Sequence, residues 1–496
     1  MMKFNVLFLL MLGFASITLV SCGEDEPCDG KTCAAGEVLD ALTCNCVSTL
    51  PCSGKTCAAN EILNATTCQC VSSQACAGKT CGANQYLDAA DCNCKNNPVV
   101  PVVVSGTISA NTTWTADKIY ELATKVYVLS GATLTIEPGT IIKGRAGIGS
   151  LATALVIAKG AKIIAEGTAA KPIIFTSIED GIQPGQINST LTKLDFGKWG
   201  GLIVLGMAPI SATNGDTETQ IEGIPGDVVF GKYGGNNPTD NSGVLKYVSV
   251  RFGGASIGDN NEINGITLGG VGSGTVVENI EIVANQDDGL EIFGGTVNVK
   301  NVIVAYQYDD ALDFDMNYSG TVDNFYVIFG GSGTDEGLEI DGPEGTTNKD
   351  GLFTLKNGTI IATDQVVTSG ADFKDAAQGT VQNVSWAGFK DGKNISIAAG
   401  FNADCTDLGT QAWAKAQEGK LIIKDCEVVS TTLTAASIAN LYLRGGAASC
   451  LTAEKQGLLD AAVATLNNKV VATATVGANK TVFNGWTWTA LNNELK

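Results

Sequence analysis

The chain has 496 residues, too many for one small core, and its 60 glycines and 6% aromatic content predict many tight turns between short strands. Asp and Glu outnumber Lys and Arg by 51 to 31, so divalent cations are more suitable partners than nucleic acid or anionic membrane surfaces. The absence of histidine excludes Ser-His-Asp and Cys-His catalysis and His-ligated zinc. An enzyme built on this chain must use carboxylates, Lys, Arg or Tyr.

Residues 1–21 are expected to be a secretory signal peptide. Lys3 precedes an apolar run from residue 4 to residue 20, for which a membrane-spanning helix is the alternative. The run ends in Leu19-Val20-Ser21-Cys22, which resembles the lipobox of bacterial lipoproteins, where cleavage precedes a cysteine that is then acylated. The resemblance implies lipidation at Cys22 and attachment to a membrane through acyl chains that do not span it.

Residues 22–26 join this cysteine to an acidic tether. Glu24, Asp25 and Glu26 follow Gly23, and the stretch resembles the surface-export signal of lipoproteins in the Bacteroidota. The resemblance implies an outer-membrane lipoprotein that faces the cell exterior. The alternatives are a plain solvated tether and retention in the periplasm.

Residues 27–95 hold three copies of the spacing Cys-x4-Cys-x10-Cys-x-Cys, one every 24 residues. Repeats this short bury too little apolar surface to fold alone, so cross-links must replace a core. Two disulfides per repeat are expected in an exported protein, with three pairings open, and a four-thiolate zinc site is the alternative. The cysteines are Cys28, Cys33, Cys44, Cys46, Cys52, Cys57, Cys68, Cys70, Cys76, Cys81, Cys92 and Cys94.

We interpret these repeats as a semi-rigid stalk, with recognition of a partner as the alternative. Residues 96–103 contain two prolines, which limit helix and sheet alike, so they are interpreted as a linker.

Residues 104–404 change character, because short runs rich in Val, Ile and Thr alternate there with Gly, Asn and Asp. This pattern predicts an all-β sandwich, barrel or solenoid, and an internal repeat decides between them. One asparagine per stacked turn, its amide bonding to the backbone of the next turn, holds a bend in a parallel β-helix. The alternative is that asparagine is simply common in turns. The recurring residues are Asn279, Asn301, Asn324, Asn357 and Asn383.

The segments at residues 131–140, 154–177, 199–206 and 261–270 resemble a family of β-helical surface lipoproteins of the Bacteroidota. The likeness covers most of residues 104–496 and leaves the cysteine repeats outside. It implies a right-handed parallel β-helix (solenoid) and a cell-surface address. It supplies no catalytic residues.

Residues 405–470 break the pattern and are predicted to form a partly helical insertion that caps the open end of the coil. Residues 406–419 and 453–468 have helical composition. Residues 471–496 are predicted to supply a terminal strand over residues 483–488. At most one disulfide can form within the odd set of Cys405, Cys426 and Cys450.

Three similar acidic segments lie between residues 286 and 344. They are Asp287-Asp288-Gly289-Leu290-Glu291-Ile292-Phe293, Asp309-Asp310-Ala311-Leu312-Asp313-Phe314-Asp315 and Asp335-Glu336-Gly337-Leu338-Glu339-Ile340-Asp341. Strand alternation places their apolar residues inward and Glu291, Asp313 and Glu339 outward in one column, with Asp315 and Asp341 in a second column. Thr267 holds the matching place one turn earlier, so the fold does not demand acid there.

Three interpretations of this face remain open. The first is a solvated acidic surface. The second is a calcium site that bridges to a glycan beside Tyr306, Tyr308 and Tyr318, because calcium prefers carboxylate oxygens. Its candidate metal ligands are Asp287, Asp309, Asp313, Asp315, Glu339 and Asp341, and its candidate ligand-binding residues add Glu291, Asp335, Tyr306 and Tyr308.

The third interpretation is a carbohydrate-active enzyme, since β-helical polysaccharide lyases and polygalacturonases carry acidic clusters on one face of the coil. A hydrolase could take its acid and base from Asp287 or Asp288 with Asp309 or Asp310. A lyase would need a cation and a base such as Arg251, but a polygalacturonase-like Gly-His-Gly segment is impossible here. The sequence therefore favours a surface-anchored binding or adhesion module with calcium as its candidate cofactor, a glycan or surface protein as partner, and no nucleic acid.

Overall fold

The computed structural model describes two units of the chain, Met1–Val100 and Pro101–Lys496. Within them the described residues are 37–40, 45–48, 56–57, 61–64, 69–72, 80–81, 85–88, 93–96, 99–258, 262–330, 333–362, 368–390, 394–432, 441–444, 448–450, 452–455, 457 and 466–496. The expected signal peptide, Cys22 and the acidic tether lie outside these residues. Among the helices that are described, none is long and apolar enough to cross a membrane.

The first unit contains three antiparallel hairpins, one in each cysteine repeat. In the second and third repeats the second cysteine pairs with the fourth, as Cys57–Cys70 and Cys81–Cys94. Because two of the four sulfurs in each of these repeats are oxidised, the zinc alternative is wrong there. The hairpins are β1 (Glu37–Asp40) with β2 (Asn45–Ser48), β3 (Glu61–Asn64) with β4 (Gln69–Ser72), and β5 (Gln85–Asp88) with β6 (Asn93–Asn96).

The remaining predicted disulfide cysteines are not described as side chains. Cys46 belongs to β2, whose side chains are not described. The others lie outside the described residues: Cys28, Cys33, Cys44, Cys52, Cys68, Cys76 and Cys92.

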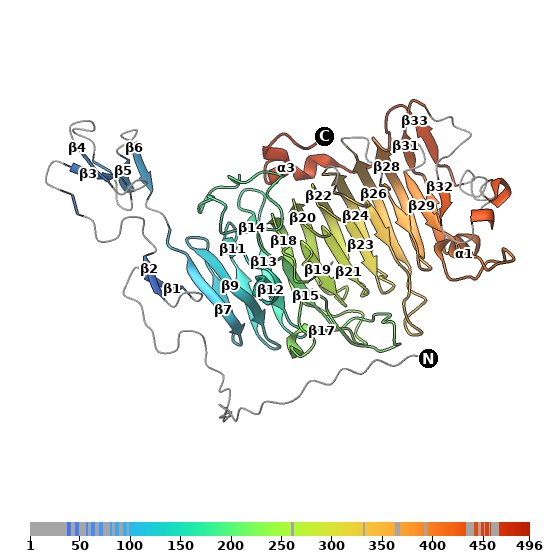
Figure 1. The fold of residues 1–496 in the computed structure, drawn as a ribbon, viewed down its shortest axis with the longest axis horizontal. Helices are drawn as coiled ribbons and strands as arrows, with labels where there is room; N and C mark the ends of the chain where they lie inside the picture. The colour runs from blue at the N-terminus through green and yellow to red at the C-terminus, as the bar shows by residue number, and fades with distance from the viewer. Residues whose placement is uncertain are drawn as a thin grey trace, which may run out of the picture. The chain divides into compact units, whose positions relative to one another are not determined.

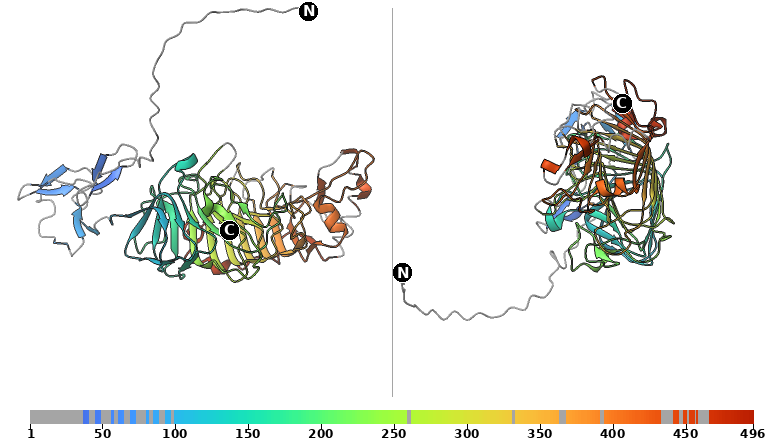
Figure 2. Two further views of the ribbon diagram at one scale, coloured as in Figure 1. Left: turned by 90° about the horizontal axis from the view of Figure 1, so that it is seen from below. Right: turned by 90° about the vertical axis from the view of Figure 1, so that its right-hand side faces the viewer.

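The second unit is a parallel β-helix, as predicted. Successive strands follow one another along the coil in chain order (Figures 1 and 2), and each pairs in parallel with the strand of the next turn. We name its first face by the short strands β12 (Ala154–Ile157), β15 (Leu202–Leu205), β19 (Ile266–Gly269), β21 (Leu290–Phe293), β23 (Leu312–Asp315), β25 (Leu338–Ile340), β27 (Asp372–Phe373), β29 (Ile395–Ala398) and β32 (Leu441–Arg444).

The second and third faces are joined by long strands that bend in the middle. These are β18 (Gly243–Arg251), β20 (Val276–Val283), β22 (Asn298–Ala305), β24 (Thr321–Ile328), β26 (Phe353–Ile361) and β28 (Gly379–Ala387). On the earliest turns the second face is built by the separate strands β8 (Thr112–Trp114), β10 (Thr133–Ile136) and β13 (Lys162–Glu166), and the third face by β11 (Ile141–Gly144) and β14 (Ile173–Ser177). There β7 (Val102–Ile108) and β9 (Ile119–Val128) run from the third face onto the first, because the second half of β9 pairs with β12.

The bend of the long strands carries the asparagine ladder. Asn279, Asn301, Asn324, Asn357 and Asn383 all have φ between 54° and 64°, a left-handed conformation that asparagine tolerates better than most residues. Asn301 Nδ2 donates to Asn279 Oδ1 at 2.9 Å, and Asn324 Nδ2 donates to Asn301 Oδ1 at 2.8 Å. The ladder therefore joins side chain to side chain, and not side chain to backbone as we expected.

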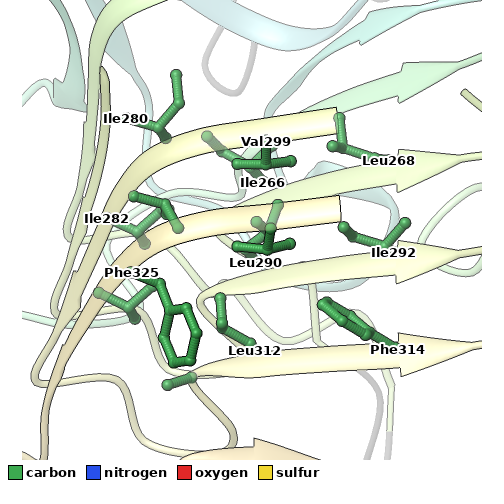
Figure 3. Packing of buried hydrophobic residues seen from close by; sticks show 14 of the residues in the cluster. Ile266, Leu268, Ile280, Ile282, Leu290, Ile292, Val299, Leu312, Phe314 and Phe325 are labelled. Atoms are coloured by element: carbon green, nitrogen blue, oxygen red, sulfur yellow. The ribbon is translucent and has the colours of Figure 1, made fainter. Parts of the chain in front are cut away.

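The inside of the coil is a continuous apolar core. Leu290, Ile292, Leu312 and Phe314 point inward from the first face and meet side chains such as Phe325 from the long strands (Figure 3). All of these side chains are fully buried, as the alternation of the acidic segments predicts. Each inward apolar pair fixes the register of its strand, so the residue between its members must point out of the coil.

The parallel coil continues beyond residue 404. In the segment predicted as an insertion, β30 (Leu421–Lys424), β31 (Glu427–Val429) and β33 (Lys469–Val471) extend the second and third faces. The helix α1 (Ala412–Gln417) lies within the first predicted helical range, whereas most of residues 453–468 lie outside the described part. Cys405 is bonded to Cys450, and Cys426 is free and buried.

The predicted terminal strand is wrong. Residues 476–496 form the 3-10 helix η5 (Lys480–Phe483) and the short helix α3 (Trp488–Leu491), which run back beside β20 and β22 on the third face (Figure 1). Trp486 and Trp488 join a second apolar cluster outside the coil with Tyr306 and Tyr326. Within this segment the first two backbone N–H groups of α3, those of Trp488 and Thr489, donate to the carboxylate of Glu281 and not to a neighbouring strand.

Candidate functional site

The acidic segments build a pocket on the outer side of the first face. The register pairs Glu291 with Asp313 and Asp313 with Glu339, and Thr267 stands one turn before Glu291, as predicted. The cavity has a volume of about 290 Å³. We call it the acidic pocket, and it is lined by Glu222, Asn264, Asp287, Asp288, Glu291, Asp309, Asp310, Asp313, Asp335 and Glu339.

The column is not a solvated surface, which corrects the first of the three interpretations. Glu291 is 5% exposed and Asp313 7% exposed. A covering segment, residues 206–242, packs Ile210 and Tyr233 against outward-facing residues of the first face such as Phe293. It includes η3 (Val229–Gly231) and a hairpin of β16 (Thr219–Gln220) and β17 (Lys232–Tyr233), and it brings Glu222 to the pocket wall.

A second row of carboxylates stands at the turns that precede the strands. The backbone N–H of Asp310 donates to Asp288 Oδ1 at 2.9 Å, and that of Glu336 donates to Asp310 Oδ1 at 2.5 Å. These bonds hold the carboxylates of Asp288 and Asp310, which are buried, while Asp309 and Asp335 stay exposed. Asp288 and Asp310, considered only in the enzyme interpretation, are therefore deeper in the pocket than the residues first proposed as ligands.

Two buried oxygen atoms in the pocket lack a hydrogen-bond donor among the described residues. They are Asp313 Oδ1 and Asn264 Oδ1, and Asn264 is only 1% exposed. Asn264 Nδ2 donates to Glu222 Oε1 at 2.8 Å and also to Glu291, which fixes the amide with its oxygen unpaired. A buried unpaired acceptor costs free energy, so these atoms indicate a missing positive partner.

Several carboxyl groups of the pocket hold protons more tightly than usual, as a raised pKa shows. Burial, together with the charges of Glu222 and Asp309, raises the pKa of Asp287 to about 8. Although Asp309 is exposed overall, partial desolvation of its carboxyl group, together with the charge of Asp335, raises its pKa to about 6. Burial also raises the pKa of Asp288, Glu291, Asp310 and Asp313, each with help from neighbouring carboxylates. A bound cation would offset this repulsion.

Three sets of carboxylate oxygens are close enough to share a cation. Within each set the oxygens lie within 4.8 Å of one another. Calcium binds oxygen at 2.3–2.6 Å, so two ligands on opposite sides of one ion lie about 5 Å apart. The sets are Asp287, Asp288 and Asp309; Asp288, Glu291 and Asp313; and Asp310, Glu336 and Glu339. Carboxylates with a buried amide oxygen suit a hard cation such as calcium.

The second predicted column lies beside the pocket and ends in a lysine. The side chains of Asp315 and Asp341 form a hydrogen bond. Burial and the charge of Asp341 raise the pKa of Asp315, so Asp315 keeps the proton that this bond requires. Lys374 Nζ pairs with Glu339 and lies 3.7 Å from Asp341 Oδ2. The pairing of Ile340 with Phe373 places Lys374 one turn beyond Asp341.

Sequence reasoning missed three residues here. Lys374 had a signal, because Gly370-Ala371-Asp372-Phe373-Lys374 repeats the form of Gly337-Leu338-Glu339-Ile340-Asp341. Asn264 follows a similar pattern one turn before the acids. No sequence pattern pointed to Glu222, because the covering segment does not repeat the pattern of the coil.

The predicted tyrosines do not line the pocket. Tyr306 packs against Trp488 with ring centroids 6.4 Å apart, because its φ of 64° at the end of β22 turns it toward the third face. Tyr318 lies inside the coil and donates to the carbonyl oxygen of Val297 at 2.7 Å. Tyr308 is exposed and packs against Phe196 in a tilted arrangement with ring centroids 4.2 Å apart.

Arg251, the predicted base of a lyase, also lies elsewhere. It is fully buried on the third face, donates to Ser249 Oγ and the carbonyl oxygen of Ile187, and lies 3.5 Å from Glu281. Its charge therefore serves the structure. The pocket itself offers no arginine among the residues that the structure places there.

Parallel strands in three faces, with a carboxylate pocket outside one of them, define a parallel β-helix protein. Residues 106–489 match the family described as "Pectate-lyase like beta helix domain", and the chain belongs to this family. No match to a curated protein or to a solved structure was found. The family indicates a carbohydrate-related role and does not distinguish binding from catalysis. Kinship with Bacteroidota surface lipoproteins stays a prediction.

Proposed function

We propose that this protein binds an anionic carbohydrate through divalent cations, calcium above all, held in the acidic pocket. The observation that carries the proposal is the unpaired Asp313 Oδ1, which is buried among carboxylates whose oxygens lie within 4.8 Å of one another. A proton can neutralise one carboxylate, but only a cation satisfies several oxygens at once.

The charge of the pocket supports a cation-dependent ligand. Nine of its ten lining residues are acidic, so a sugar carboxylate would be repelled unless cations stood between. A cation held by protein oxygens on one side keeps positions for ligand oxygens on the other, as calcium takes about six to eight ligands. Membership of a carbohydrate-related family points to a uronate or another acidic sugar as the source of those oxygens.

Binding is favoured over elimination chemistry because, among the described residues, no arginine or lysine lines the pocket to act as a base. Arg251 is buried on the third face, and Lys374 is engaged by Glu339 and Asp341. An inverting hydrolase is also disfavoured, since its two carboxyl groups stand about 6.5–9.5 Å apart to admit a water, whereas oxygens of Asp287 and Asp309 lie within 4.8 Å.

Hydrolysis with retention is the second candidate, because the same spacing approaches the 5–5.5 Å of a retaining pair. Burial raises the pKa of Asp287 to about 8, which keeps the proton of a general acid at neutral pH, and Asp309, whose pKa partial desolvation raises to about 6, would be the nucleophile. This reaction predicts new reducing ends, which pure binding does not.

We further propose that lipidated Cys22 attaches the protein to the outer membrane, facing the cell exterior, where the cysteine repeats act as a stalk and the coil as an adhesin. The support is the leader and the lipobox-like sequence. Cys22→Ser should move the protein from the membrane fraction to the soluble fraction. If the Cys22→Ser variant stayed in the membrane fraction, the proposed lipid anchor would be contradicted.

The function is tested by binding to a panel of immobilised acidic and neutral polysaccharides, with calcium or with a chelator. We expect retention on at least one acidic polysaccharide in calcium and release by the chelator, without new reducing ends or unsaturated products. Retention that ignores the chelator would contradict the cation-dependent mechanism. Detection of new reducing ends or unsaturated products would show that the protein is an enzyme and not a binding module.

A further inference from the structure

Among the described residues, one lysine forms an ion pair with a carboxylate of the acidic pocket. Lys374 follows β27 on the turn after Glu339, and its ammonium pairs with Glu339 and approaches Asp341 to 3.7 Å. Its side chain is 26% exposed, so this ion pair is partly withdrawn from solvent. The position matters because Asp315 and Asp341 occupy the equivalent place on the two preceding turns.

The other carboxylates have no such partner. Across the described residues, no lysine or arginine forms an ion pair with Asp287, Asp288, Glu291, Asp309, Asp310 or Asp313. The unpaired oxygens Asp313 Oδ1 and Asn264 Oδ1 both belong to residues that line this pocket. Glu339 therefore has a positively charged partner in the protein, whereas the other carboxylates named here have none among the described residues.

We propose that Lys374 is a built-in counter-cation that fills the third of three cation positions, so that the pocket takes two divalent cations and not three. This inference rests on the proposed function. The two cations occupy the sets that share Asp288, whose carboxylate bridges them, and the third set is closed because Glu339 is bound to the ammonium. An ammonium beside that set also repels a divalent ion.

The role of Lys374 is thus to set the number and place of the bound cations. With the third position closed, the cations gather toward Asn264 and Glu222, where the covering segment meets the coil. The anionic part of the ligand must then dock at that end of the pocket. Replacing the ammonium by a neutral group should open one more cation position.

The experiment counts bound calcium on the purified chain by equilibrium dialysis at pH 8.5. Wild type should bind two ions, Lys374→Gln three, and Lys374→Arg two, because arginine keeps the charge. Lys356→Gln is the matched control, since Lys356 lies 3.3 Å from Asp323 on a long strand away from the pocket, and it should bind two. Asp288→Asn should weaken calcium binding at both positions, because it removes the carboxylate that bridges the two ions.

The outcomes separate this inference from the proposed function. Two ions on wild type and two on Lys374→Gln would overturn the inference and leave the proposed function standing. No ion on wild type would overturn both. One or three ions on wild type would also overturn the inference. If Lys374→Gln does not fold, the counts for wild type and Lys374→Arg decide, and both must be two.

Discussion

Asp288 Oδ1 accepts the backbone N–H of Asp310 at 2.9 Å, so this buried carboxylate is held by the turn that follows it. Asp310 repeats the contact with the N–H of Glu336. The acids at these turns therefore stabilise the coil through one oxygen and leave the other for the pocket. Structure and candidate function share the same side chains.

This dual use predicts different effects for two substitutions at position 288. Asp288→Asn keeps an acceptor for the N–H of Asp310, so its free energy of unfolding without calcium should match or exceed that of wild type. Asp288→Ala strands that buried N–H and should cost about 1–3 kcal/mol. Urea denaturation in a chelator measures both values. Equal losses in the two variants would contradict the structural role of the bond.

The covering segment should contribute directly to cation affinity. Glu222→Gln removes a carboxylate that hydrogen-bonds to Asn264 at 2.8 Å and lines the pocket, so calcium affinity should fall at least tenfold. Glu218→Gln is the matched control, because Glu218 lies on the same segment but pairs with Lys159 outside the pocket. Calorimetry measures the affinities, and similar values for the two variants would place the cation away from Glu222.

The raised pKa values predict an unusual dependence of stability on pH. A buried acid with a raised pKa keeps its proton in the folded state after the unfolded state has released it. Asp287, with a pKa that burial raises from 3.8 to about 8, therefore lowers the free energy of unfolding as pH rises between these values. Below this window the effect vanishes, and above it the penalty is complete.

Melting curves in a chelator from pH 5 to pH 8.5 measure this effect. The melting temperature of wild type should fall by several degrees relative to Asp287→Asn over that range, and calcium should restore it at pH 8.5. If the melting temperatures of the two proteins changed in parallel with pH, the acidic pocket would not control the pH dependence of stability.

The C-terminal segment should act as a clamp on the coil. Glu281 accepts from the backbone N–H groups of Trp488 and Thr489, each at 2.9 Å, and faces Arg251 across a fully buried ion pair. Glu281→Ala leaves that arginine charge unpaired and should cost about 3–5 kcal/mol in guanidinium denaturation. Glu278→Ala, on the same strand but half exposed, should change stability by less than about 0.5 kcal/mol. Equal effects would contradict the clamp.

The sequence was sufficient for the coil and for the order of its acids. The alternation of Leu290-Glu291-Ile292 and its repetition one turn later determine both the inward core and the outward column, because strand side chains alternate with a period of two. Burial of that column could not be predicted, since it depends on the covering segment, where Glu222 has no periodic neighbour. It meets Asn264, 42 residues further along the chain.

The C-terminal segment was misread for a related reason. Trp486-Thr487-Trp488 alternates like a strand, but Trp488 meets the carboxylate of Glu281, 207 residues earlier in the chain. Long-range polar contacts of this kind leave no local pattern. Lys374 was recognisable only by comparing its turn with the acidic turns before it.

The central claim is that the acidic pocket holds divalent cations, and a calorimetric calcium titration of the purified chain at pH 8.5 tests it most directly. Wild type should bind calcium, Asp313→Asn should lose at least tenfold in affinity, and Asp117→Asn, at an exposed site outside the pocket, should match wild type. Absence of heat and of any shift in melting temperature with wild type, or indistinguishable titrations of wild type and Asp313→Asn, would contradict the claim.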